Sequence, residues 1–564
     1  MSPRDLPVLE FTPPIAGSGP DGGAPRTPPT PEDERLVQFR PEERSLPRFF
    51  VWTLGCQMNK SDSEEMAGRL LAAGCPEAPS MEQADLVVIN TCAIREAAES
   101  KVIGRQGQLK HLKAANPGMR VVLTGCSVRE SNRTGLARRY PAVDLFLRPD
   151  EEPELVDRLG LASAQAPVGA LATTAATTLV KGAEVSDATH LVRARADALA
   201  GGAILRTSAI SAWLPIIYGC DKTCTYCIVP FSRGPERSRP FDEIVDEARA
   251  LAAAGYREVT LLGQNVNSYG HDLPPEDRFA HVDTERTVGR RQDRAARPDL
   301  AELIRAVDAV RDPADATRPA IGRLRFVTSH PWDLSDRLVD AMRDCPSLCA
   351  SLHLPVQSGS DSMLRRMGRQ YTIEHYQERL ARIREAVPGI ALSTDVIVGF
   401  CGETEEEYEA TIRLLEAVRY DQVFAAAYSE RPGTPATRLA DDVPADVKRR
   451  RLVDLLKVQE AIGLERNRAW LGRTAEVLVD QVVPQRAHDH ADDATGAGAD
   501  TEEAEGTSES RDAFARLPEG LAHLVGRSRE NKLVHVAGSP ALLGETVGVR
   551  IEHAGPYALR GSLA

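Results

Sequence analysis

The sequence contains no apolar run long enough to cross a membrane. A spanning helix needs about 20 consecutive apolar residues, and no stretch approaches that length. The first residues, MSPRDLPVLEFTPP, also lack the basic segment followed by an apolar one that is typical of a signal peptide. We therefore expect a cytoplasmic protein with no membrane partner. Cysteines stay reduced in that compartment, so clustered cysteines indicate metal binding or catalysis rather than disulfides.

The chain also lacks the excess of positive charge that is typical of nucleic-acid-binding proteins. Its 69 basic residues face 82 acidic ones, so the formal net charge is −13. Most of this charge lies in two segments of low complexity, because residues 1–47 carry −3 and residues 486–512 carry −7. The rest of the chain is near −3, which leaves room for a basic face. The acidic composition therefore does not exclude RNA as a partner.

Apolar patterning and low-complexity stretches divide the 564 residues into segments. Stretches rich in Pro, Gly, Ala, Thr or charge have weak apolar periodicity and predict disordered or linking segments. The predicted organisation is a disordered leader (1–46), an N-terminal α/β domain (47–160), a linker (161–208), a central domain (209–445), a connecting helix (446–469) and a C-terminal domain (470–564) with an acidic insertion (485–515). The polar stretch 271–297 is predicted to be a surface insertion in the central domain.

The predicted fold class is α/β. Strand-like runs alternate with helical stretches in the first two domains, which predicts parallel sheets with helices on their faces. The N-terminal domain is expected to be an open parallel sheet with strands at 49–54, 86–90, 121–124 and 143–147. The central domain has six strand–helix units, which fit a partial (β/α)6 barrel with its active face at the carboxyl ends of the strands. Short strands with Gly turns in the last domain indicate a small β-barrel.

Three cysteines crowd together directly after an apolar run that predicts a buried strand. Cys220, Cys224 and Cys227, here called the core trio, have the spacing C-x3-C-x2-C. Thiolates this close converge on one soft metal centre, and a [4Fe-4S] cluster is the natural candidate. Such a cluster needs four ligands, so one iron would be open to a small molecule that chelates it. Free thiols or a zinc knuckle are the alternatives, but zinc sites usually present paired ligands, and no partner pair follows.

A second set of three cysteines lies in the N-terminal domain. Cys56, Cys92 and Cys126, here called the N-terminal trio, each follow one of the first three predicted strands. Open α/β sheets place ligands at the carboxyl edge of their strands, so we expect these thiols to meet and to hold a second cluster. The alternative is three buried, inert cysteines, a residue type that is common in cores. Cys75, at the end of a predicted helix, is predicted to be structural.

Polar segments that contain glycine follow three strands of the central domain. Gln264 and Asn265 follow the second strand, Gln357 and Ser358 follow the fourth, and 399–403 follows the fifth. Singly such residues are weak signals, because loops favour them anyway. Together on the active face of a barrel they predict a pocket for a ligand.

Two other features of the sequence do not require a functional explanation. Segment 59–64 predicts a helix start, with Ser61 or Asp62 as the cap and acids in the first turn. In the C-terminal domain, a solvated charged face and RNA binding explain the basic residues equally well. These basic residues are Arg527, Arg529, Lys532, Arg550 and Arg560.

With Tyr226 before its last cysteine, the core-trio loop resembles the signature of the radical S-adenosylmethionine (SAM) enzymes, C-x3-C-x-aromatic-C. Nearly the whole ordered chain also resembles the methylthiotransferases of that superfamily, which join a three-cysteine domain, a radical SAM barrel and a C-terminal TRAM domain. The motif Gly-Cys-Gln-Met-Asn-Lys-Ser-Asp-Ser-Glu at 55–64 is similar to the MiaB branch. Further matching segments are 90–96, 262–269 and 353–361. Cys401 and Glu430 depart from the usual motifs, because each stands where the family has Pro.

The resemblance implies a reaction, its cofactors and its partners. SAM would chelate the open iron of a [4Fe-4S] cluster on the core trio and be cleaved to a 5′-deoxyadenosyl radical, while a second [4Fe-4S] cluster on the N-terminal trio would carry sulfur. Carbon-2 of N6-isopentenyl(dimethylallyl)adenosine, next to the anticodon of tRNA, would receive a methylthio group. The expected partners are this tRNA and a reducing system such as flavodoxin or ferredoxin, and the chain is expected to be a monomer. The residues expected to contact SAM are Gln264, Asn265, Gln357 and Ser358.

Two other functions stay open at this point. A sister methylthiotransferase would act on threonylcarbamoyladenosine or on an aspartate of a ribosomal protein, but those branches typically carry other residues after the first cysteine. A non-enzymatic, RNA-binding iron–sulfur sensor would use the same thiols and would form no 5′-deoxyadenosine from SAM.

Overall fold

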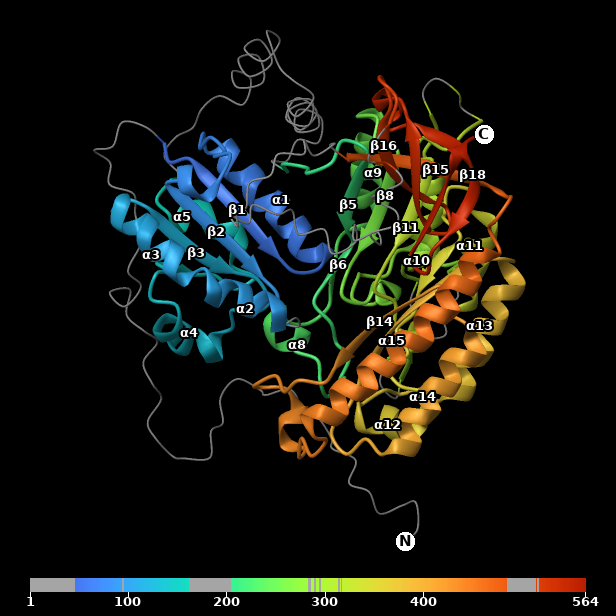
Figure 1. The fold of residues 1–564 in the computed structure, drawn as a ribbon. Coiled ribbons are helices and arrows are strands. Elements are labelled where there is room, and N and C mark those ends of the chain that lie inside the picture. Colours follow the sequence, from blue (N-terminus) through green and yellow to red (C-terminus); the bar gives the residue numbers. More distant parts are fainter. Residues whose placement is uncertain are drawn as a thin grey trace.

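The computed structural model describes residues 46–93, 96–161, 204–282, 286–288, 291–293, 296–312, 315, 317–483, 514 and 517–564. Figure 1 shows an N-terminal α/β unit (blue), a central unit (green and yellow) and a C-terminal β-barrel (red). Nearly all of the predicted leader, most of the predicted linker and most of the acidic insertion lie outside the described residues. Within the described ranges, no helix is both long and apolar enough to cross a membrane.

The N-terminal unit is a parallel sheet of four strands in the order β1-β2-β3-β4. Its strands are β1 (Phe49–Leu54), β2 (Leu86–Thr91), β3 (Arg120–Thr124) and β4 (Leu145–Phe146). Its helices are α1 (Gln57–Ala72), α2 (Glu96–Gly104), α3 (Gln106–Ala115), α4 (Arg133–Arg139) and α5 (Leu155–Arg158). All six residues of β2 are buried, as expected for a parallel sheet that is covered on both faces. The predicted open α/β sheet is confirmed.

The predicted start of the first helix is wrong. α1 begins at Gln57 with Cys56 at the N-cap, so Ser61 and Asp62 lie inside the helix and cap nothing. The five residues at 59 and 61–64 are all buried. Asn59, Asp62, Ser63 and Glu64 bind groups from other segments rather than the N–H groups of their own first turn. In the sequence, such a buried polar face has the same composition as a helix start.

The central unit contains six parallel strands in two sheets, β11-β8-β5 and β12-β13-β14. An isolated parallel bridge between Leu324 and Leu348 joins the two sheets. The strands are β5 (Ser211–Pro215), β8 (Glu258–Leu262), β11 (Arg323–Phe326), β12 (Ser351–His353), β13 (Ala391–Val398) and β14 (Gln422–Ala427). The helices are α9 (Phe241–Ala253), α10 (Leu300–Asp308), α11 (Asp336–Asp344), α13 (Ile373–Ala386), α14 (Glu405–Val418) and α15 (Ala445–Arg468). The predicted partial (β/α)6 barrel is confirmed.

The first predicted strand of the barrel is interrupted. β5 ends at Pro215, which has no N–H to continue a ladder. The chain then forms β6 (Ile217–Tyr218), which pairs antiparallel with β7 (Arg237–Ser238) just before the core trio. Short elements that the sequence did not predict are α8 (Val229–Ser232), α12 (Asp361–Arg366) and the pair β9 (Arg286–Val288) and β10 (Arg291–Asp293) inside the predicted insertion.

The C-terminal unit is a closed barrel with the strand order β15-β16-β17-β19-β18. Its strands are β15 (Thr474–Val483), β16 (Ala522–Ser528), β17 (Leu533–Gly538), β18 (Thr546–Ala554) and β19 (Ala558–Leu563). Alternate residues such as Val477, Val534 and Ile551 fill its interior. The predicted small β-barrel is confirmed.

Basic side chains dock the C-terminal barrel onto the central unit. Arg323 and Arg325 of β11 donate to backbone carbonyl oxygens at β15 and β16. Arg529 donates in the opposite direction, to three carbonyl oxygens of the central unit. The buried Lys532 Nζ lies 2.6 Å from Asp421 Oδ1. Of the basic residues for which the sequence left two explanations, Arg529 and Lys532 are therefore docking contacts.

Lys532→Met is expected to destabilise the docked C-terminal barrel. The change leaves the buried carboxylate of Asp421 with one cation fewer, and breaking a buried pair costs about 3 kcal/mol. The midpoint of thermal unfolding and the sensitivity of the barrel to limited proteolysis check this. Lys457→Met is the matched control, because Lys457 pairs with Asp454 at an exposed surface and should cost under about 1 kcal/mol. Equal midpoints of thermal unfolding and equal proteolysis of the barrel in the two variants would contradict the docking role of Lys532.

Candidate functional site

The N-terminal trio lies at one edge of the β1–β4 sheet. Leu54 pairs with Thr91 and Asn90 pairs with Thr124, so β1, β2 and β3 end at nearly the same level. The N–H of Cys92 continues this pairing, because it donates to the carbonyl oxygen of Leu54 at 2.8 Å. The three thiols thus follow neighbouring strand ends, at the edge where open α/β sheets bind ligands.

Glycines let these strand ends approach one another. Gly125 has a φ of +92°, in the left-handed region that favours glycine. A Cβ at this position would overlap the backbone carbonyl oxygen of Thr91. Gly55, which precedes the first thiol, would in the same way meet the side chain of Asn59. Two of the three thiols therefore follow glycines that have no room for a side chain.

Buried amides hold the first thiol in place. Cys56 Sγ donates to Asn59 Oδ1 at 3.3 Å, and Asn59 Nδ2 donates to Asn90 Oδ1 at 2.7 Å. Asn90 Nδ2 in turn donates to Ser63 Oγ at 3.1 Å. The buried polar face of α1 is therefore the support of Cys56.

The third thiol of this trio is bound by an arginine of the central unit. Arg233 Nε donates to Cys126 Sγ at 3.1 Å, and Arg233 Nη2 lies 2.5 Å from Asp62 Oδ2 on α1. Burial raises the pKa of Cys126, whereas the charge of Arg233 lowers it and the charge of Cys56 raises it. The interaction with Cys56 indicates that these two thiols lie near one another.

The core trio occupies the loop after β6, at the carboxyl end of β5. Gly219, with a φ of +74°, precedes Cys220, and a Cβ on it would overlap the carbonyl oxygen of Pro235. The N–H of Cys220 donates to the carbonyl oxygen of Gly234 at 3.1 Å. The segment that follows α8 therefore packs directly against the start of the core-trio loop.

The core trio also has its own arginine. The buried Arg369 donates from Nη1 to Cys224 Sγ at 3.4 Å and from Nη2 to the carbonyl oxygen of Pro355 at 2.8 Å. Burial raises the pKa of Cys227 to about 12, and among its neighbours the charges of Cys224 and Cys126 add to the rise. The two trios are also connected by geometry, because Arg233, which binds Cys126, precedes Gly234, whose carbonyl oxygen accepts the N–H of Cys220. Figure 1 accordingly shows α8, which follows Cys227, beside the blue unit.

The surroundings of the thiols suit [4Fe-4S] clusters, whose thiolate ligands each bind a different iron. Each trio also has one sulfur that accepts from a buried guanidinium, and such donors stabilise negative charge on sulfur.

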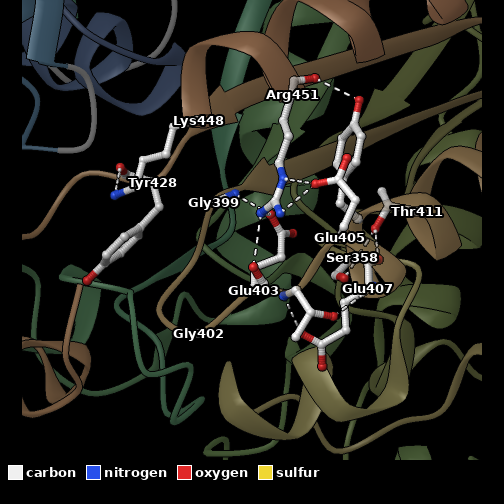
Figure 2. Close-up of polar contacts among 12 residues, drawn as sticks. Ser358, Gly399, Gly402, Glu403, Glu405, Glu407, Thr411, Tyr428, Lys448 and Arg451 are labelled. Atoms are coloured by element: carbon white, nitrogen blue, oxygen red, sulfur yellow. Dashed lines mark hydrogen bonds and ion pairs between the residues drawn. The ribbon is translucent and has the colours of Figure 1, made fainter. Parts of the chain in front are cut away.

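Two of the four residues predicted to contact SAM also support loops. Gln264 Oε1 accepts the N–H of Gly219 at 2.6 Å and so holds the backbone in front of the core trio. Ser358 is fully buried, and its hydroxyl lies 3.3 Å from that of Thr411 on α14, as Figure 2 shows. That Gln264 and Ser358 contact SAM stays a prediction.

The other two predicted residues have features of a ligand site. The buried Asn265 donates from Nδ2 to Asp333 Oδ2 at 2.7 Å, and its Oδ1 has no partner among the described residues. Gln357 has a φ of +70°, a strained conformation that is found preferentially at functional sites. Asp333 also pairs with Lys222 of the core-trio loop at 2.7 Å. Asn265 and the loop are therefore tied to the same carboxylate.

The loop after β13 is held firmly although Cys401 replaces the Pro of the family motif. The N–H of Gly399 donates to Glu403 Oε2 at 2.5 Å, and Arg451 of α15 pairs with the same carboxylate at 2.8 Å. Figure 2 shows this pairing together with the contact between Arg451 and Glu405. Cys401 is buried in a small apolar cluster with Phe400, so it is a packing residue.

The two arginines that bind sulfurs, and the aspartate that pairs with one of them, were not predicted as site residues from the sequence. Arg233, Arg369 and Asp62 are each less than 10% exposed, whereas arginine and aspartate are usually surface residues. Of the three, Arg233 carried a signal, because it lies six residues after Cys227 in the same short segment. Arg369 reaches Cys224 through the tertiary fold, and Asp62 acts on Cys126 through Arg233.

Comparisons with known proteins identify the family. Residues 214–415 match the radical SAM superfamily, and residues 48–148 match the uncharacterized protein family UPF0004. A tRNA-2-methylthio-N(6)-dimethylallyladenosine synthase of Acetivibrio thermocellus is 38% identical over 91% of this chain and 90% of its own. The proteins of that name from a Roseiflexus species and from Desulfitobacterium hafniense are 37% and 38% identical, over 95% and 90% of this chain and 93% and 95% of theirs. The chain therefore belongs to the family of the tRNA-2-methylthio-N(6)-dimethylallyladenosine synthases, within the radical SAM superfamily.

Proposed function

We propose that this chain transfers a methylthio group to carbon-2 of N6-dimethylallyladenosine in tRNA. As a member of the radical SAM superfamily it uses SAM and a [4Fe-4S] cluster. Relatives named for this activity match nine-tenths or more of the chain. The observation that carries the proposal is that two cysteine trios, each with a buried arginine on one sulfur, are connected through the segment of Arg233 and Gly234 at the junction of two α/β units.

The core trio holds the cluster that binds SAM, and the N-terminal trio holds a second [4Fe-4S] cluster. When bound, these groups supply a 5′-deoxyadenosyl radical and the sulfur of the methylthio group. This chemistry suits the substrate, because the C–H bond at carbon-2 of a purine has no acidic proton for a general base to remove. Asn265 and Gln357 are the residues of this chain proposed to contact SAM.

The protein surroundings of the trios prepare the site for this reaction. Cys126 and Cys224 are each less than 10% exposed, which keeps bulk water away from these two sulfurs. Arg233 and Arg369 offset the negative charge that develops on them, since a buried charge without a partner is costly. The tRNA is the macromolecular partner, a flavodoxin or ferredoxin is the proposed electron donor, and the proposed state is a cytoplasmic monomer.

Alanine substitutions in the two trios are expected to separate the cleavage of SAM from the methylthiolation of the substrate. Cys220→Ala should abolish cleavage of SAM, because the SAM-binding cluster loses a ligand. Cys92→Ala should keep SAM cleavage and lose methylthiolation. Iron counting after anaerobic reconstitution should give about eight irons per chain for the parent and about four for each variant. Formation of product by both variants would contradict the assignment of the clusters.

The identity of the substrate can be checked with matched RNAs. Anticodon stem-loops that carry N6-dimethylallyladenosine should be methylthiolated, whereas the same stem-loops with adenosine or threonylcarbamoyladenosine should not. Nucleoside digests analysed by mass spectrometry measure this directly. A preference for the threonylcarbamoyl RNA, or cleavage of SAM without modification of any RNA, would contradict the proposed substrate.

Gly125→Ala is expected to disrupt the second cluster alone. The added Cβ would overlap the carbonyl oxygen of Thr91, and the left-handed φ strains any L residue there. We expect roughly half of the iron to be lost while SAM cleavage continues. Gly135→Ala is the matched control, because a Cβ on Gly135 meets no atom within 4 Å. If both variants bound iron as the parent does, Gly125 would not be needed to place Cys126.

A further inference from the structure

Arg233 lies in a short segment that contacts both trios. The segment 233–236 follows α8, which itself follows the core-trio loop. Its Gly234 accepts the N–H of Cys220 at 3.1 Å, and Pro235 lies against Gly219. The side chain of Arg233 extends the other way, to Cys126 of the N-terminal unit. One segment therefore connects the start of the core-trio loop with a sulfur of the other trio.

The position of Arg233 is fixed at both ends. Its N–H donates to the carbonyl oxygen of Val229 at 2.8 Å, so its backbone belongs to the end of α8. Its guanidinium lies 2.5 Å from Asp62 Oδ2, and the whole residue is only 5% exposed. Neither the backbone nor the head group can move without breaking a buried contact. A movement of Arg233 would therefore shift Cys126 relative to the core trio.

Arg233 also keeps a positive charge next to this sulfur. An arginine guanidinium stays protonated in proteins, and this one is paired with the carboxylate of Asp62. The guanidinium thus donates a charge-assisted N–H···S bond. Donors to cluster sulfurs are among the factors that set the reduction potential of an iron–sulfur centre.

We propose that Arg233 is a positioning residue that fixes the N-terminal trio relative to the core trio and, through its bond to Cys126 Sγ, raises the reduction potential of the cluster held there. Asp62 orients the guanidinium from the opposite side. This inference rests on the proposed function for its effect on product formation, but its effect on the cluster does not depend on the identity of the substrate.

A second buried arginine between the same units supplies the control. Arg206 pairs with Glu247 at 2.7 Å and lies 3.8 Å from Glu64 of α1, yet no contact with a thiol involves it. Arg206 and Arg233 are equally buried, at 4% and 5% exposed. If Arg233 only held the units together, substitutions at Arg233 and at Arg206 would have equal effects on the reduction potential of the N-terminal cluster and on product formation.

The experiment compares Arg233→Lys, Arg233→Gln and Asp62→Asn with Arg206→Lys and Arg206→Gln, all as reconstituted full-length protein. The reduction potential of the N-terminal cluster is measured by electron paramagnetic resonance titration in a Cys220→Ala background, so that only that cluster is present. We expect a more negative potential for Arg233→Gln, a smaller shift for Arg233→Lys and none for the Arg206 variants. With the core trio intact, the methylthiolated nucleoside formed per 5′-deoxyadenosine should fall about tenfold or more in Arg233→Gln, because small misplacements of reacting groups are costly.

Two outcomes would overturn the inference. One is an unchanged reduction potential of the N-terminal cluster in Arg233→Gln. The other is an equal fall, in Arg233→Gln and Arg206→Gln, of the methylthiolated nucleoside formed per 5′-deoxyadenosine. Arg233→Lys keeps the charge and the size of the side chain nearly intact, so it provides a folded variant if Arg233→Gln is unstable. A parent protein that forms no methylthiolated nucleoside would instead contradict the proposed function. In that case a shifted potential in the Arg233 variants would still support the positioning role.

Discussion

The buried charges between the N-terminal and central units are the constraint on which the rest of the structure depends. An ion that leaves water costs several kcal/mol unless it is paired, so the units can dock only where these charges meet their partners. Arg233 meets Asp62, and Arg206 lies 3.8 Å from Glu64, in the same arrangement. That arrangement also brings Cys126 to the segment whose Gly234 accepts the N–H of Cys220. The contacts that hold the units together are therefore the contacts that assemble the site.

The C-terminal barrel docks at the opposite end of the central strands. Arg323 is the first residue of β11 and binds backbone carbonyl oxygens of the barrel, whereas the core trio follows the carboxyl end of β5. The basic charge of this unit cannot be assigned to RNA from composition, because Arg529 and Lys532 are used for docking. An RNA bound to the barrel would have to extend along the central unit to reach the thiols.

The sequence predicted the framework of the site well and its surroundings poorly. Cysteine spacing and the alternation of strands and helices are local signals, so the two trios and the sheets that carry them could be predicted. Asp62 was assigned to a helix cap because a polar run before a helix and a polar face inside one have the same composition, and only the tertiary partner, Arg233, separates them. The contacts of Gln264 with Gly219 and of Ser358 with Thr411 could not be predicted, because the direction of a side chain within a loop is set by packing.

The two trios use the same two structural devices in unrelated loops. In each trio, one thiol follows a glycine in the left-handed region. These glycines, Gly125 and Gly219, bring the chain against a backbone carbonyl oxygen. A buried arginine then donates to one sulfur, from the central unit in both cases. Burial alone disfavours a charged sulfur, so each trio needs a fixed cation to be stable without water. Because the cation of the N-terminal trio comes from the other unit, that trio has its full electrostatic environment only when the two units are docked.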